Sequence, residues 1–255
     1  MWDWLANICL RSGHTRIMLP VIVAGLVFHQ RGLYERMACF LFFAMTFNKF
    51  LKHIFRIPLF PHLGKGYAFP SGHMHSTMMF YGCVFYRVKD RRIRALMLVI
   101  LLGEAFSLMH FRFHDLADLL GAIGFALVEI LCYHQLVSKF GEERGERYAA
   151  ALAVGLSLFS IVTLSVLQAA ADYAWIAFYS LLGIVLATQL DEGTLETLGQ
   201  RLLALLVSGV MVCLVFVIYR ALNFQHYSLS EMKFLFIPSI VIGSINFSSG
   251  RRLPF

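Results

Sequence analysis

Charged residues are scarce in this chain, at 15% of its 255 residues, whereas soluble proteins carry roughly 25%. Hydrophobic residues make up 59%, which excludes an ordinary soluble globule. Apolar runs of about 17 to 23 residues recur, long enough to cross a bilayer core of about 30 Å. The sequence therefore predicts an all-α, polytopic transmembrane helical bundle of eight or nine spans. These lie near residues 17–30, 37–55, 72–88, 95–111, 115–137, 149–170, 173–190, 202–221 and 233–247.

Cysteine is sparse and unpaired, which argues against a disulfide scaffold and against redox chemistry. The 5 cysteines are scattered singly, and no pair has the spacing of a metal or redox motif. We interpret them as small, buried, apolar thiols. A carboxylate-rich or Cys/His ligand cluster is also missing from the sequence. We therefore predict no metal and no cofactor.

The net charge of +7 comes largely from loops at one end of the predicted spans and from the basic residues of the candidate site. By the positive-inside bias, these loops face the cytoplasm. The motifs described below fall at the other end, so we expect them on the outer or periplasmic face of a bacterial inner membrane. Anionic lipid headgroups explain the charge, and we predict no nucleic-acid partner. The basic residues of the cytoplasmic loops include Arg31, Arg36, the Arg87–Arg94 cluster, Lys139, Arg144, Arg147 and Arg201.

The candidate chemistry is confined to the first half of the chain. Residues 1–137 carry all the motifs, and a hydrophilic segment predicted as a loop, Ser138–Arg147, follows them. Residues 138–255 are expected to add helices that act as a scaffold or line a substrate cavity. Glu104 and Glu129 lie within predicted spans, where ionisable residues are functional candidates by default. For Glu104 we favour a helix–helix hydrogen bond or a neutral acid, and neither residue enters the predicted site.

A basic stripe closes the second predicted span. Lys49, Lys52, His53 and Arg56 follow the spacing i, i+3, i+4, i+7, which places them on one face of a helix. Such a face suits a multiply charged oxyanion, because Lys supplies a point charge and Arg a fork of donors. The alternative is snorkelling of basic side chains to the lipid headgroups.

The tetrapeptide Pro70-Ser71-Gly72-His73 follows a loop rich in proline and glycine and opens the third span. Backbone N–H groups at a helix start are unpaired and attract anions together with the helix dipole. The Ser71 hydroxyl adds a donor, and Gly72 permits a close approach of the backbone. His73 is then placed to give a proton to a leaving oxygen. The alternative is an ordinary Ser-capped helix with interfacial histidines.

His114 and Asp118 are four residues apart at the start of a further helix. The carboxylate can hold one ring nitrogen and so leave the other nitrogen basic, as in an activated nucleophile. Asp115 is interpreted as a charge partner of the helix N-terminus. The alternative is an acidic and histidine-rich helix cap.

Together these segments resemble the type 2 phosphatidic acid phosphatase superfamily, which includes lipid phosphate phosphatases, glucose-6-phosphatase and the vanadium haloperoxidases. The pattern Lys-x6-Arg-Pro appears with Lys49 and Arg56, although Pro58 comes one residue late. Pro-Ser-Gly-His is intact. Ser-Arg-x5-His-x3-Asp appears as Ser107 to Asp118 with Leu108 in place of the arginine. The resemblance covers roughly residues 45–137.

The resemblance implies a catalytic role for each motif. His114 would form a phosphohistidine with Asp118 orienting it, and His73 would protonate the leaving alcohol and then activate water. Lys49, Arg56, Ser71 and Gly72 would hold the phosphoryl oxygens. Losing a donor such as the missing arginine typically costs about 10²–10³ in rate. Arg112, one turn beyond Leu108 if the helix continues, is the candidate replacement.

Three functions remain open from the sequence. The first is a membrane phosphatase acting on a phosphomonoester or diphosphate of a lipid or polyprenyl carrier. The second is a phosphotransferase with the same phosphohistidine and an acceptor other than water. The third is a non-enzymatic transporter or lipid-binding protein in which the basic stripe conducts or holds anions. We favour the phosphatase, because an apolar chain with its site at the helix ends suits a lipid substrate.

Overall fold

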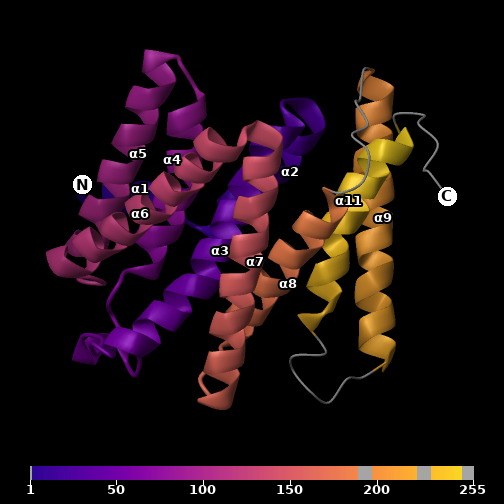
Figure 1. The fold of residues 1–255 in the computed structure, drawn as a ribbon. Coiled ribbons are helices and arrows are strands. Elements are labelled where there is room, and N and C mark those ends of the chain that lie inside the picture. The colour runs from indigo at the N-terminus through magenta and orange to yellow at the C-terminus, as the bar shows by residue number, and fades with distance from the viewer. Residues whose placement is uncertain (1, 189–196, 223–230, 249–255) are drawn as a thin grey trace.

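The computed structural model describes residues 2–188, 197–222 and 231–248, and these fold into a bundle of helices (Figure 1). An isolated antiparallel bridge between Pro58 and Tyr67 closes the loop after α3. The prediction of an all-α fold is confirmed. The helices are α1 (Trp2–Ser12), α2 (Thr15–Phe28), α3 (Arg31–Phe55), the short 3₁₀ helix η1 (Pro61–Leu63), α4 (Gly72–Arg87), α5 (Arg91–His110), α6 (Leu116–Phe140), α7 (Glu142–Val166), α8 (Asp172–Ala187), α9 (Leu198–Leu222) and α11 (Lys233–Ser248).

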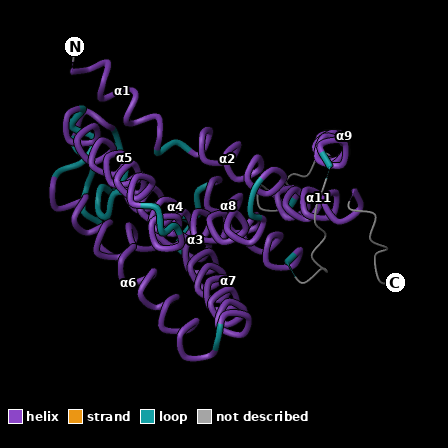
Figure 2. The backbone as a smooth tube through the Cα atoms, turned by 90° about the horizontal axis from the view of Figure 1, so that it is seen from above, coloured by secondary structure: helices purple, strands orange, loops and turns teal. Residues whose placement is uncertain are grey.

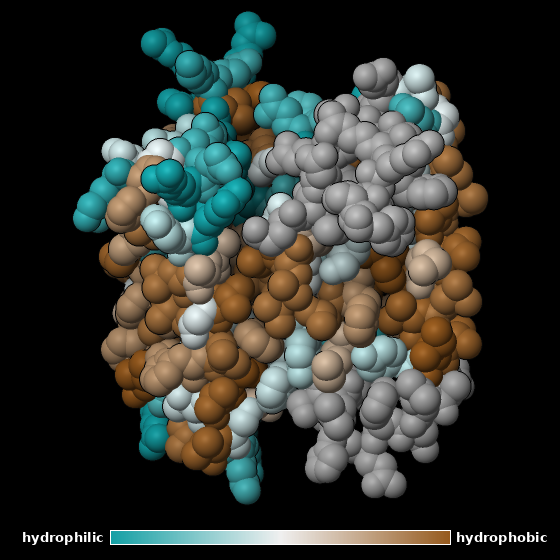
Figure 3. Space-filling model, turned by 45° about the vertical axis from the view of Figure 1, so that its right-hand side comes forward, coloured by the Kyte–Doolittle hydropathy of each residue, from teal (hydrophilic) through white to brown (hydrophobic). Residues whose placement is uncertain are grey.

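The helices have the length and the apolar surface of membrane spans. Within the described residues, 5 helices, namely α3, α5, α6, α7 and α9, are long and apolar enough to cross a bilayer, and α2, α8 and α11 are shorter apolar helices. Large apolar side chains such as Leu102 and Leu206 are exposed on them. Figure 3 shows a hydrophobic belt between hydrophilic ends. Soluble proteins rarely expose apolar surface on this scale, so it indicates a helical membrane protein.

Helix α3 lies at the centre of the bundle and packs against α2, α4, α7 and α8. Seen from above, α1 and α5 lie to one side of it and α9 and α11 to the other (Figure 2). Its inner face supplies Leu41 and Phe43 to the core, which Phe80 of α4 and Leu181 of α8 complete. The second half of the chain therefore shares one core with the first.

The segment Ser138–Arg147 is not the predicted loop. Helix α6 runs to Phe140 and α7 begins at Glu142, with only Gly141 between them at a φ of +81°. Ion pairs explain its hydrophilic sequence. Two acidic residues of α7 form ion pairs with neighbouring helices. Arg36 of α3 places its Nε 2.8 Å from Glu146, and Arg87 of α4 places its Nη1 2.7 Å from Glu142. The acidic residues thus join three helices at the end of the bundle opposite the motifs.

The cysteines fit their predicted role only in part. All five are free thiols, and Cys83 is buried between helices. Cys132 and Cys213 are exposed on α6 and α9, so their interpretation as buried residues is wrong. Both lie on apolar helices, where a small apolar thiol can face lipid as readily as protein.

Candidate functional site

The N-termini of α4 and α6 meet at the site. Ser71 is the N-cap of α4, and its Oγ accepts a hydrogen bond from Met74 N at 3.4 Å. The backbone N–H of Ser71 donates to the carbonyl oxygen of Asp118 at 3.1 Å. The first amides of a helix have no acceptor within it, so the N–H groups of Gly72 and His73 have no partner within α4. The second and third motifs are therefore joined at a positively polarised helix start.

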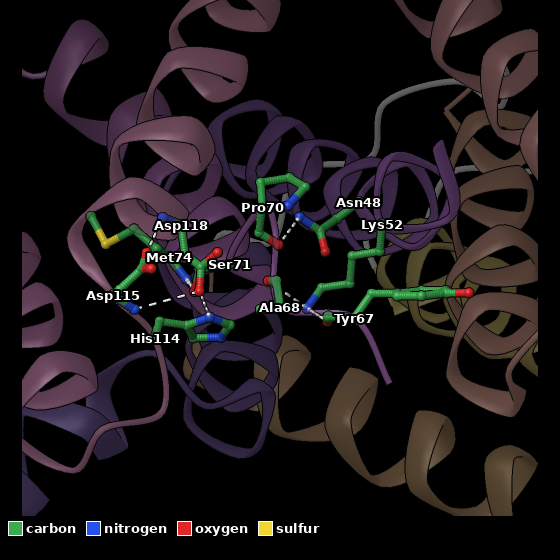
Figure 4. Close-up of polar contacts among 10 residues, drawn as sticks. All are labelled: Asn48, Lys52, Tyr67, Ala68, Pro70, Ser71, Met74, His114, Asp115 and Asp118. Carbon is green, nitrogen blue, oxygen red and sulfur yellow. Dashed lines mark hydrogen bonds and ion pairs between the residues drawn. The ribbon is translucent and has the colours of Figure 1, made fainter. Parts of the chain in front are cut away.

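His114 and Asp118 form the contact that their spacing predicts. Nδ1 of His114 lies 2.9 Å from Oδ2 of Asp118, in the loop and first turn that join α5 to α6 (Figure 4). Asp115 is the N-cap of α6, where its Oδ1 accepts from Asp118 N at 2.8 Å and its N–H donates to Asp118 Oδ2 at 3.4 Å. This capping box fixes the Asp118 carboxylate. His114 Nε2 is thereby left as the free ring nitrogen.

The surroundings of His114 favour the neutral form of its imidazole. Burial lowers the pKa of His114, and the nearby Lys52 ammonium lowers it further, whereas the hydrogen bond with Asp118 raises it by less than burial lowers it. The side chain is 10% exposed and that of Asp118 is 5% exposed. A neutral imidazole with one nitrogen tied to a carboxylate is in the protonation state that a nucleophile requires.

His73 and His114 line the same pocket, which has a volume of about 220 Å³. A third imidazole, that of His14, completes its polar wall. The rest of the lining is apolar and comes from α1, the loop after α3 and the end of α5. Those residues are Leu10, Leu59, Leu63, Leu108 and Phe113.

Lys52 is the cation whose charge acts on the His114–Asp118 pair. Its Nζ donates to the carbonyl oxygens of Tyr67 and Ala68 at 2.8 and 3.1 Å (Figure 4). Because an ammonium has three N–H donors, one remains for an anion in the site.

The basic stripe is not one continuous helix face. Helix α3 ends at Phe55, and Arg56 is its C-cap in the left-handed conformation, with a φ of +53°. The exposed Arg56 guanidinium donates to the carbonyl oxygen of His53 at 3.1 Å. Lys49 is half-buried on α3, one turn before Lys52. The prediction that Arg56 shares a helix face with Lys49 is therefore wrong, and Lys52 is the member of the stripe that reaches the site.

Leu108 and Arg112 do not share a helix face either. Helix α5 ends at His110, so Arg112 lies beyond it, exposed and left-handed with a φ of +53°. The premise on which Arg112 was the candidate replacement for the missing arginine, a helix that continues from Leu108 to Arg112, is wrong. Leu108 itself is 1% exposed and packs against Met74 and Leu119 in the floor of the site.

A buried polar chain supports the turn before Ser71. Asn48 Nδ2 donates to the carbonyl oxygen of Pro70 at 3.3 Å and lies 3.3 Å from His75 Nδ1. His75 Nε2 lies 3.0 Å from Glu129 Oε2 on α6. A Cβ on Gly72 would lie 3.1 Å from Asn48 Oδ1, so glycine permits this close approach. The chain holds α3, α4 and α6 together behind the site.

His14 was not predicted from the sequence. It precedes α2 and meets His73, 59 residues later, with 3.5 Å between its Nδ1 and His73 Nε2. Nothing in its local sequence marks it, because the contact depends on how α1 and α2 pack against α4. Among the residues that the structure describes, no group of three or more His, Cys, Asp or Glu side chains is arranged to hold a metal ion.

The chain matches no protein-family model, and neither a curated protein nor a solved structure is similar to it.

Proposed function

We propose that the chain is an integral membrane phosphatase that hydrolyses a phosphomonoester or diphosphate on a lipid or polyprenyl carrier. The observation that carries the proposal is the pair of histidines in one pocket. His114 is oriented by Asp118 at 2.9 Å, and His73 stands across from it at the start of α4. The order and spacing of the three motifs, which resemble those of type 2 phosphatidic acid phosphatases, give independent support.

The proposed reaction has two steps. In the first, His114 Nε2 attacks phosphorus, the bond from phosphorus to the leaving oxygen breaks, and that oxygen takes a proton from His73. In the second, water attacks the phosphohistidine, His73 takes the proton of the water, and inorganic phosphate leaves. Lys52 and the first amides of α4 offset the charge on the phosphoryl oxygens in both steps.

The surroundings of the pocket favour an amphiphilic substrate. Its imidazoles suit a phosphate, whereas its leucines suit a hydrocarbon chain beside the headgroup. We count the long and short apolar helices and α4 as nine spans, with α1 lying along the membrane surface. The basic residues at the opposite end then favour a site on the outer face of a bacterial inner membrane.

The test is a turnover assay on the purified full chain. Phosphatidic acid, phosphatidylglycerophosphate, undecaprenyl diphosphate, lipid A and glucose 6-phosphate are offered in turn, and both released and transferred phosphate are measured. We expect free phosphate from at least one lipid. Transfer to a second lipid without phosphate release would instead identify a phosphotransferase, and no turnover of any substrate would refute an enzyme.

Two histidine variants make the assay specific. His114→Ala is expected to abolish turnover, because it removes the attacking nitrogen. His134→Ala, at the far end of α6, is the matched control and is expected to keep full activity. Alkaline denaturing quench of the wild-type protein during turnover is expected to trap a base-stable, acid-labile phosphohistidine that His114→Ala lacks.

A further inference from the structure

The turn between α1 and α2 packs against α4 and α5 beside the site. Tyr81 of α4 donates its hydroxyl to the carbonyl oxygen of Ser12 at 3.1 Å. A Cβ on Gly13 would collide with the buried Glu104 carboxylate of α5 and lie 2.7 Å from Thr77 Oγ1, so any larger residue there would force these side chains to move. The next residue, His14, is therefore held in place by the packing of Ser12 and Gly13.

This turn presents His14 edge-on to His73. The two rings are 5.2 Å apart between centroids and cross at 85°, with His14 Nδ1 aimed at His73 Nε2 at 3.5 Å. An imidazole has one donor and one acceptor nitrogen when neutral. A ring facing His73 Nε2 therefore selects which His73 nitrogen carries the proton.

We propose that His14 is the positioning residue of His73, as Asp118 is the positioning residue of His114. The inference rests on the proposed function, since it assigns His14 to the step in which His73 protonates the leaving oxygen. His14 acts by accepting a hydrogen bond from Nε2 of the His73 imidazolium, which holds the ring so that the proton on its other nitrogen, Nδ1, passes to that oxygen. The charged and titratable groups around His73 are Lys52 on α3, His114 on the loop before α6, and His14 itself.

Leaving-group dependence distinguishes this role from a structural one. An alkyl phosphate needs a proton on its leaving oxygen. The 4-nitrophenolate that leaves 4-nitrophenyl phosphate is stable as an anion and needs none. General acid catalysis contributes about 10²–10⁴ in rate. We expect the rate of His14→Ala on the alkyl ester to fall roughly tenfold to a hundredfold, because only part of that contribution depends on the position of the His73 ring. On the aryl ester, we expect its rate to change by less than about threefold. His14→Asn places an amide where Nδ1 stood and is expected to restore most of the alkyl rate, whereas His14→Gln is not.

Non-additivity provides the second criterion. If His14 acts only through His73, the double variant His14→Ala/His73→Ala is no slower on the alkyl ester than His73→Ala alone. Equal losses on both esters, or additive losses in the double variant, would overturn the proposal.

The contact is also tested without turnover. In protein with ¹⁵N-labelled histidine, the ring nitrogens of His14 and His73 are expected to titrate together, as coupled groups do, and His14→Gln is expected to change the His73 curve. An unchanged His73 curve would overturn the pairing. Lack of phosphate release by the wild-type protein would refute the proposed function separately, and the titration would still decide whether the two rings form a pair.

Discussion

Replacing Asp118 by asparagine tests whether its carboxylate acts through charge or through shape. A single oxygen, Oδ2, accepts from both His114 Nδ1 and the N–H of Asp115. Since an amide nitrogen placed there would face two donors, we expect the asparagine oxygen to occupy the Oδ2 position. His114 then keeps its proton on Nδ1, and the variant loses only the negative charge.

The expected loss follows from the hydrogen bond that is weakened. A bond to a charged group contributes about 1.5–3 kcal/mol and a neutral one about 0.5–1.5 kcal/mol. The difference between the midpoints of these ranges, roughly 1.2 kcal/mol, corresponds to about an eightfold lower kcat. Asp118→Ala removes the whole bond, and we expect a loss of about a hundredfold.

Asp115→Asn is the matched control, because it makes the same chemical change three residues earlier in the same capping box. Asparagine caps a helix as well as aspartate, so we expect its kcat to stay within about threefold of the wild type. Phosphate release from the preferred substrate is measured for all three variants. A loss on the order of 10⁴ in Asp118→Asn would mean that the amide had turned and placed the proton on Nε2. That result, or an equal loss in Asp115→Asn, would refute the reasoning.

Three further outcomes are expected. Because burial lowers the pKa of His114 from its ordinary value of 6.5, activity falls as pH drops through a midpoint below about 6.5; an acidic midpoint of kcat/KM at or above that value would contradict this. Leu108→Ala lowers the unfolding free energy in detergent by about 2–5 kcal/mol, whereas Leu102→Ala, exposed on the same helix, has little effect; equal melting shifts would contradict the packing of the site floor. His75→Leu leaves Asn48 and Glu129 without the imidazole as a hydrogen-bond partner and lowers the free energy of unfolding by about 2–6 kcal/mol. The control variant His134→Leu is expected to melt near the wild-type temperature.

The sequence predicted the helices well, because apolar runs of span length leave few alternatives in a membrane. The contacts within each motif, Ser71 with Met74 and His114 with Asp118, form as expected, since each is local to one helix start. The two motifs also lie together, joined by the hydrogen bond from Ser71 N to the carbonyl oxygen of Asp118. The phosphoryl oxygens were assigned to Lys49 and Arg56, with the helix taken to continue to Arg56, whereas α3 ends at Phe55 and Lys52 interacts with His114 and Asp118. The position of a helix end depends on capping and tertiary packing. The contribution of His14 was beyond prediction, as no local pattern encodes a contact between the first turn of the bundle and α4.

The buried chain from Asn48 through His75 to Glu129 has a consequence for how the protein is made. Helix α4 is not among the apolar helices of the bundle, because its first two turns carry histidine, serine and threonine. Such a segment partitions poorly into lipid alone. During synthesis, Asn48 on α3 is already available to it, whereas Glu129 on α6 arrives later. Stable insertion of α4 therefore depends on its neighbours, and the polar groups that support the site also set the order in which the bundle can assemble.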